Sequence, residues 1–220
     1  MKVLALTDIH GSYKMASDII RKESADVVLI GGDLTTIGTV KEAEEALDLF
    51  KPDAARLFCI AGNMDLPQHD QLFEKRGLSL NACGVRVGDV GFFGASAAPF
   101  SSLHTPYEIS EEELSQRIRK GFQMVSGAPT KVFVPHAPPF GTRLDIIHSG
   151  IHVGSMAVRE FIEEYQPEVV VCGHIHEARG VDNIDKSQIV NCGTVAYGNY
   201  AVITINHGIV IKNLHYKNAP

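Results

Sequence analysis

Hydrophobic residues fall into short runs in the first part of the chain, and amphipathic stretches with helical spacing separate these runs. The runs KVLALT, DVVLIGG and RLFCIAG are rich in Val, Ile and Leu, as buried strands are. The amphipathic stretches predict helices over residues 13–23 and 40–50. Strands that alternate with helices in this order are typical of βαβ units, so a parallel sheet is predicted here.

The pattern changes after a third predicted helix near residues 67–76. The segments GVRVGD and VGFFGAS predict a hairpin that turns at Gly88 and Asp89. The remaining predicted elements are helices over residues 110–125 and 155–165 and strands at KVFVP, QPEVVVCG, 180–184, 188–192 and 200–216. Parallel units followed by antiparallel strands favour two sheets packed face to face with helices outside.

Length and charge restrict the class of protein. The chain has 220 residues, of which 45% are hydrophobic, so a single domain over residues 1–220 is expected. Charged residues make up 21%, and the formal net charge of −6 lacks the basic excess of proteins that bind nucleic acid through its phosphates. Nucleic acid is therefore not the expected partner.

The apolar runs are too short to cross a bilayer, which takes about 20 residues. The first run leads into an acidic residue and lacks a small-residue cleavage site, so it is interpreted as a strand and not as a signal peptide. The 4 cysteines include no Cys-x-x-Cys pair, and buried thiols are expected at Cys59, Cys172 and Cys192, with Cys83 near a turn. These features predict a soluble, cytoplasmic protein with no membrane partner.

Side chains that bind metals stand at the ends of the predicted apolar strands. They are Asp8, His10, Asp33, Asn63, His136, His174 and His176. Loops beyond the carboxyl ends of strands bind ligands in α/β sheets, so these side chains are expected to converge. Their oxygen and nitrogen atoms suit Mn²⁺, Fe²⁺, Co²⁺, Ni²⁺ or Zn²⁺. The set is too large for one ion, and one carboxylate can bridge two metals about 3.5–4 Å apart.

The order of these motifs resembles that of the calcineurin-like metallophosphoesterase family. The matching segments are Asp8-Ile9-His10, Gly32-Asp33, Gly62-Asn63, His136 and Gly173-His174-Ile175-His176. The resemblance implies an α/β fold, a four-layer αββα sandwich of two mixed β-sheets flanked by helices. It also implies a small phosphoester substrate and two divalent metal ions, with Mn first and Fe, Ni, Co or Zn as alternatives. The implied ligands are Asp8, His10 and His176 for one metal and Asn63, His136 and His174 for the other, with Asp33 bridging.

The predicted catalytic residues are Asp33, Asn63 and Asp65. Two bridged metals lower the pKa of a shared water and offset charge on the phosphoryl group. The commonest family pattern has His after the motif Asn, whereas this chain has Met64, and a thioether cannot deliver a proton. Without that imidazole, Asp65 cannot form the usual acid dyad. Its alternative role is to bond a metal-binding His or the backbone.

Two long loops, residues 96–107 and 137–153, are predicted to set substrate specificity. Arg143 and His148 in the second loop are the candidate substrate contacts. Histidines outside these motifs and this loop are expected to be solvated; they are His69, His104, His207 and His215.

Other interpretations of the same residues stay open. Taken singly, Asp8 and Asp33 could be helix N-caps or turn formers. Small members that lack the family His are associated with phosphodiester cleavage, so a phosphodiesterase is preferred and a phosphomonoesterase is the alternative. The retromer subunit with this fold is a non-catalytic scaffold whose metal site is eroded, and some relatives with extra domains are nucleases. A homo-oligomer is compatible with the sequence.

Overall fold

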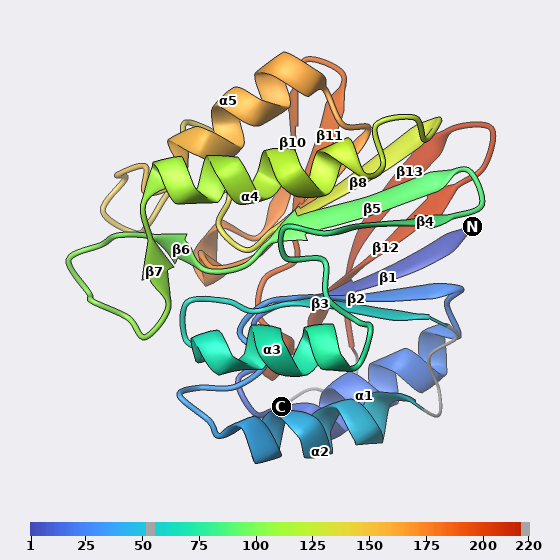
Figure 1. The fold of residues 1–220 in the computed structure, drawn as a ribbon, viewed down its shortest axis with the longest axis vertical. Helices are drawn as coiled ribbons and strands as arrows, with labels where there is room; N and C mark the ends of the chain where they lie inside the picture. Colours follow the sequence, from blue (N-terminus) through green and yellow to red (C-terminus); the bar gives the residue numbers. More distant parts are fainter. Residues whose placement is uncertain (52–55, 217–220) are drawn as a thin grey trace.

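Two β-sheets pack face to face in the computed structural model, which describes residues 1–51 and 56–216 (Figure 1). Within these residues the first sheet has 5 strands in the order β13-β12-β1-β2-β3. Strands β1, β2 and β3 run parallel, whereas β12 and β13 are antiparallel. The bounds are β1 Lys2–Leu6, β2 Val27–Gly31, β3 Leu57–Ile60, β12 Asn199–Ile205 and β13 Ile209–His215.

The second sheet has 6 strands among the described residues, in the order β10-β11-β9-β8-β5-β4. Its central strands β11, β9, β8 and β5 are parallel, and β10 and β4 pair antiparallel at the two edges. The bounds are β4 Gly84–Val87, β5 Val90–Ala95, β8 Thr130–Pro135, β9 Val169–Cys172, β10 Gly180–Ile184 and β11 Ser187–Asn191. Strands β4 and β5 form the predicted hairpin.

Helices cover the outer face of each sheet (Figure 1). The first sheet carries α1 (Tyr13–Glu23), α2 (Val40–Phe50) and α3 (Pro67–Lys75), and the second carries α4 (Glu111–Gln123) and α5 (Met156–Tyr165). Short 3-10 helices, η2 (His176–Ala178) and η3 (Val195–Tyr197), follow β9 and β11. The expected four-layer αββα sandwich is confirmed. No helix in the described part of the chain is long and apolar enough to cross a membrane.

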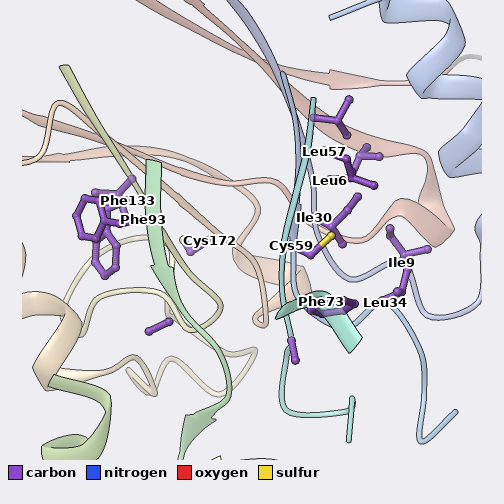
Figure 2. Close-up of a cluster of buried hydrophobic side chains, with 14 of the residues drawn as sticks. Leu6, Ile9, Ile30, Leu34, Leu57, Cys59, Phe73, Phe93, Phe133 and Cys172 are labelled. Atoms are coloured by element: carbon purple, nitrogen blue, oxygen red, sulfur yellow. The ribbon is translucent and has the colours of Figure 1, made fainter. Parts of the chain in front are cut away.

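Buried side chains alternate between two layers of core. Val3 and Ala5 of β1 belong to the cluster between the sheets, whereas Leu4 and Leu6 belong to the cluster beneath the helices. Figure 2 shows Leu6 and Ile30 on one side of the paired sheets, with Phe93 and Phe133 on the other. Central strands are thus buried on both faces, which explains why they read as continuous apolar runs.

Serine side chains begin the two helices over the second sheet, as the sequence predicts. Ser110 Oγ accepts a hydrogen bond from the Glu113 backbone N–H at 3.1 Å. Ser155 Oγ accepts one from the Val158 N–H, also at 3.1 Å. Each bond satisfies a helix N-terminal amide that has no partner inside the helix.

A small two-stranded sheet was not predicted. Its strands β6 (Ala98–Pro99) and β7 (Glu108–Ile109) pair in parallel and close a loop that projects beside α4 (Figure 1). We call residues 98–109 the flap. Two-residue strands contain too few positions to show a hydrophobic period, so the sequence pattern gives only a loop here.

Candidate metal centre

Both sheets contribute to the cluster of predicted ligands. Asp8, Asp33 and Asn63 follow strands β1, β2 and β3 of the first sheet. His136 follows β8, and the segment with His174 follows β9, in the second sheet. All of these strands end at the same edge of the sandwich, so residues distant in sequence meet in one site, as expected for parallel strands.

One group of donors consists of Asp8, His10 and His176. The Nε2 atom of His176 lies 3.2 Å from Asp8 Oδ1 and 3.4 Å from His10 Nε2. One donor atom from each of the three residues falls within 4.8 Å of the others. Ligands that share an ion at about 2.0–2.2 Å are spaced in this way.

A second group consists of Asn63, His136 and His174. The Asn63 Oδ1 atom lies 2.9 Å from His136 Nε2 and 2.7 Å from His174 Nδ1. Both imidazoles come from the second sheet and the carboxamide from the first. The group therefore joins the two sheets.

Asp33 lies between the two groups. Its Oδ2 atom is 3.6 Å from His10 Nε2 in the first group and 3.4 Å from His136 Nε2 in the second. Its Oδ1 atom accepts a hydrogen bond from the Met64 backbone N–H at 2.7 Å. The carboxylate is thus fixed in a position from which one side chain can contact ions on both sides.

The hydrogen-bond pattern of His136 fits a metal ligand. Its Nδ1 atom lies 3.0 Å from the Gly31 carbonyl oxygen, and because a carbonyl only accepts, Nδ1 carries the proton. The Nε2 lone pair then faces the carbonyl oxygen of Asn63. This side of the ring can therefore take a cation, either a proton on Nε2 or a divalent metal ion held by Nε2 and the Asn63 side-chain oxygen.

Buried charges also draw positive charge into the site. Burial lowers the pKa of His136, but the carboxylates of Asp33 and Asp8 outweigh it and raise that pKa to about 9. Burial and the neighbouring His136 lower the pKa of His174 to about 3. Burial raises the pKa of Asp8, yet the His176 hydrogen bond and His136 bring it down to about 2. Metal ions would replace the proton that His136 otherwise holds.

Four of the predicted ligands have strained backbone conformations. Asp8, His10, Asp33 and His174 have φ angles of 53°, 46°, 49° and 68°. Only a few per cent of non-glycine residues adopt this left-handed conformation. Strain of this kind persists where the surrounding structure enforces it, commonly at functional sites.

Two glycines are required by close approach to the carboxylates. A Cβ on Gly62 would lie 2.1 Å from Asp33 Oδ1, and a Cβ on Gly173 would lie 2.1 Å from Asp8 Oδ2. Real Cβ atoms do not come so close to an oxygen, so any larger residue would displace the carboxylate. This close approach explains the glycines in the motifs Gly62-Asn63 and Gly173-His174.

Asp65 supports the site from behind. Its fully buried carboxylate accepts hydrogen bonds from the backbone N–H groups of Leu34, Thr35 and Gly62 at 2.9–3.1 Å. Burial raises the pKa of Asp65, but hydrogen bonds from His69 and the backbone hold it below its usual value. Asp65 does not line the cavity described below, so its geometry is that of a positioning residue and not of a proton donor to substrate.

The expectation that His69 is solvated was wrong. This imidazole is completely buried near the start of α3, where Nδ1 lies 3.3 Å from the Leu66 backbone nitrogen and 3.4 Å from Asp65. It occupies the helix position at which Glu or Gln usually closes a capping box. A helix-end role of this kind has no hydrophobic period to reveal it. The other three, His104, His207 and His215, are exposed as expected.

The two candidate substrate contacts have exposed side chains that pair with carboxylates. Arg143 pairs with Asp182 at 3.3 Å, with 75% of its side chain exposed. His148 is 90% exposed and lies 3.9 Å from Glu177. Neither is among the residues that line the cavity beside the donors, and substrate contact through them stays a prediction.

A cavity of about 550 Å³ opens onto the donors. Its lining includes His10, Asp33, Asn63, His174 and His176 on one side, together with Met64. Most of the other lining residues belong to the flap and to the loop over residues 137–153, and the rest are Glu111, Gly154 and Ile175. The loops over residues 96–107 and 137–153 were expected to set substrate specificity. Sequence reasoning missed the individual side chains there, although apolar residues such as Phe100 and Leu103 in a polar loop were a usable signal.

Comparison with known proteins identifies the family. The family model described as calcineurin-like phosphoesterase matches residues 1–178, a span that contains every predicted ligand. The chain belongs to this family. Family membership and the clustered donors support a metal-dependent hydrolase of phosphoesters.

Relatives of this family member are found in distant organisms. An uncharacterized protein of Methanocaldococcus jannaschii is 30% identical over 201 residues, which cover 90% of each chain. A UPF0046 protein of Caenorhabditis elegans is 25% identical over an alignment 223 positions long, which covers 90% of this chain and 71% of that protein.

Solved structures share the phosphoesterase fold at low sequence identity. A protein of Thermus thermophilus superimposes with a TM-score of 0.73 at 15% identity, over 96% of this chain and 98% of that one. A dimetal phosphatase from Danio rerio has a TM-score of 0.63 at 11% identity, over 98% and 96% of the two chains. These likenesses concern the fold.

Proposed function

We propose that this family member is a phosphodiesterase with a dinuclear metal centre, and that Mn²⁺ is its preferred metal. The observation that carries the proposal is Asp33, whose Oδ2 atom lies within 3.6 Å of a donor in each group. A shared carboxylate is how two-metal hydrolases hold their ions close together. The Danio rerio phosphatase with a similar fold is also described as a dimetal protein.

Each donor would have a defined task with metals bound. Asp8, His10 and His176 would hold one ion, and Asn63, His136 and His174 the other, with Asp33 bridging. A pair of divalent ions makes water acidic enough to attack phosphorus at neutral pH and offsets charge on the phosphoryl oxygens. The Gly31 carbonyl fixes the His136 ring, and the buried Asp65 holds the backbone just after Asp33 and just before Asn63.

The phosphodiester preference rests on the surroundings of the donors. Glu108 and Glu111 line the same cavity, and no Lys or Arg is among the described residues that line it. A phosphomonoester carries about one more negative charge than a diester at pH 7, so these carboxylates disfavour it. A phosphomonoesterase is the second candidate. Cytoplasmic location and a homo-oligomeric state stay predictions.

The test combines metal content with turnover. Protein loaded with Mn²⁺ and desalted should retain two ions per chain, hydrolyse bis(4-nitrophenyl) phosphate and lose activity on chelation. Asp33→Asn should retain at most one ion and lower kcat at least about 10²-fold, a loss typical for removal of one electrostatic contact to the transition state. Asp89→Asn is the matched control because Asp89 is 86% exposed in the β4–β5 turn.

Three results would contradict the proposal. One is a metal content at or below one ion that Asp33→Asn leaves unchanged. Another is full turnover by Asp33→Asn. The third is a lack of turnover on any ester with Mn²⁺, Ni²⁺ or Zn²⁺ together with metal-independent binding to a partner protein, which would favour a non-catalytic scaffold.

A further inference from the structure

The cavity beside the metal centre has two chemically different walls. The donors form part of its lining, and hydrophobic side chains form another part, which we call the apolar wall. The apolar wall consists of Phe100 and Leu103 of the flap, Ile147 and Val153 of the 137–153 loop, and Ile175 between the histidines of the last motif. Phe100 and Leu103 are 71% and 78% exposed, although water contact with such side chains is unfavourable.

The flap holds these exposed side chains in place. The Glu108 carboxylate accepts hydrogen bonds from the backbone N–H and hydroxyl of Ser101 and from those of Thr105, at 2.7–3.1 Å. Burial raises the pKa of Glu108, but these hydrogen bonds bring it to about 2, so the carboxylate is charged at neutral pH. These hydrogen bonds to the charged Glu108, which we call the clasp, therefore close the loop that carries Phe100 and Leu103.

The base of the flap is joined directly to the donors. The Tyr107 backbone N–H donates to the Asn63 carbonyl oxygen at 3.0 Å. The Tyr107 hydroxyl donates to Asp70 at 2.6 Å and accepts from Arg117 at 2.7 Å. The apolar wall thus has a fixed position relative to the metal ligands, as a specificity subsite requires.

Charge along the cavity restricts what can occupy it. Glu108 and Glu111 are acidic, and neither Lys nor Arg is among the lining residues in the described part of the chain. Glu111 accepts hydrogen bonds from Ser155 Oγ and the Met156 and Ala157 N–H groups, which hold it in place. A second phosphate on the substrate would meet these carboxylates without a cation to balance it.

We propose that the apolar wall is a subsite for one of the two groups that are esterified to the phosphate of the substrate, and that this group is uncharged and apolar. The substrate is then a phosphodiester with an aliphatic or aromatic ester group and without further phosphates. The apolar wall and the donors line the same cavity, so we take the group that occupies the wall to be part of the substrate. The inference rests on the proposed phosphodiesterase function, and the test distinguishes failure of that function from failure of the subsite.

Equilibrium binding tests the subsite without turnover. O-alkyl methylphosphonates carry the single negative charge of a phosphodiester and resist hydrolysis, and methyl, butyl and hexyl esters would be titrated into Mn²⁺-loaded protein by calorimetry. The Kd should fall about two- to fourfold for each added methylene, because burial of apolar surface accompanies each one. The double variant Phe100→Ala, Leu103→Ala should bind the methyl ester normally and lose most of this dependence on chain length.

Leu49→Ala is the matched control, because Leu49 is 45% exposed on α2, away from the cavity, and its loss should leave the chain-length dependence intact. Thermal melts of all variants should stay close to the natural protein, since the substituted side chains are exposed. A Kd independent of chain length, no binding of any ester, or an unchanged dependence in the double variant would overturn the inference. Chain-length-dependent binding with no turnover of 4-nitrophenyl alkyl phosphates would refute the proposed function and leave the subsite standing.

Discussion

Individual residues at this site are constrained by their backbone as much as by their donor atoms. Four ligands have left-handed φ angles, and Gly62 and Gly173 leave no room for a side chain beside Asp33 and Asp8. Hydrogen bonds between strand ends enforce these conformations, such as those from the Asp8 N–H to the Gly32 carbonyl and from the His10 N–H to the Asp33 carbonyl, both at 3.0 Å. The strained φ angles lower the stability of the folded chain and hold the donor atoms in position.

Met64 is the residue at which the proton supply to a leaving group can be tested. Its side chain lines the cavity, while its backbone N–H bonds to Asp33, so a substitution changes the side chain and keeps that contact. Met64→His should raise turnover of alkyl-leaving esters more than that of 4-nitrophenyl esters, by up to about 10²-fold, because only poor leaving groups need a general acid. The measurement is the slope of log kcat against leaving-group pKa.

Met64→Leu is the control for this experiment, since Leu has similar volume and no proton to give. A slope that is shallow in the natural protein and identical in Met64→His would show that another group already delivers the proton. His69 and Asp65 are not suited to that role, because both are fully buried and neither lines the cavity.

At the scale of elements, the sequence predicts the helices and strands whose hydrophobic residues form a regular pattern. Helices α1 and α2 have the predicted bounds, and α4 and α5 begin at the predicted serine caps. The clustering of the candidate metal ligands was equally predictable from the sequence, because these residues follow apolar strands. The flap was not predictable in this way, since it is held by hydrogen bonds of Glu108 with Ser101 and of Tyr107 with Asp70, which depend on the folded structure. The place of Arg143 beside Asp182 depends on a neighbouring strand in the same way.

Glu108 is predicted to control the order of the flap. Glu108→Gln removes the charge that strengthens the hydrogen bonds to Ser101 and Thr105, so amide hydrogen exchange at these two residues should accelerate about five- to tenfold. Glu112→Gln, a change on the exposed face of α4, should leave both rates unchanged. Equal rates in the natural protein and in Glu108→Gln would show that the clasp does not order the loop.

The pH dependence of the flap follows from the lowered pKa of Glu108. A carboxylate whose pKa falls from its usual 4.5 to about 2 on folding stabilises the folded flap fully above pH 4.5. This stabilisation is lost as the pH falls toward 2. Between pH 5 and 8 no change in flap order should therefore arise from this residue, and amide exchange corrected for its intrinsic pH dependence can measure it.

For the whole molecule, metal binding is predicted to join the two sheets, because each donor group includes residues from both. Metal at 100 times its Kd stabilises the folded chain by about 2.7 kcal/mol per site. For a chain of this size this corresponds to a rise in Tm of about 5–10 °C per site. Calorimetric scans of Mn²⁺-loaded and chelated protein would measure it, with Asp33→Asn expected to show a smaller shift. Identical scans with and without metal would contradict a centre that connects the sheets.

The pairing of β1 with β12 has a consequence for how the protein is made. Strand β1 is complete at Leu6, but its antiparallel neighbour is not synthesised until residues 199–205. Thr194, just before β12, also donates its hydroxyl proton to the Asp8 carbonyl oxygen at 2.7 Å. At about 5–20 residues per second, a ribosome leaves β1 without this neighbour for roughly 10–40 s. The backbone at Asp8, the first predicted ligand, therefore gains this contact only near the end of synthesis, and we predict that stable metal loading follows translation and does not guide it.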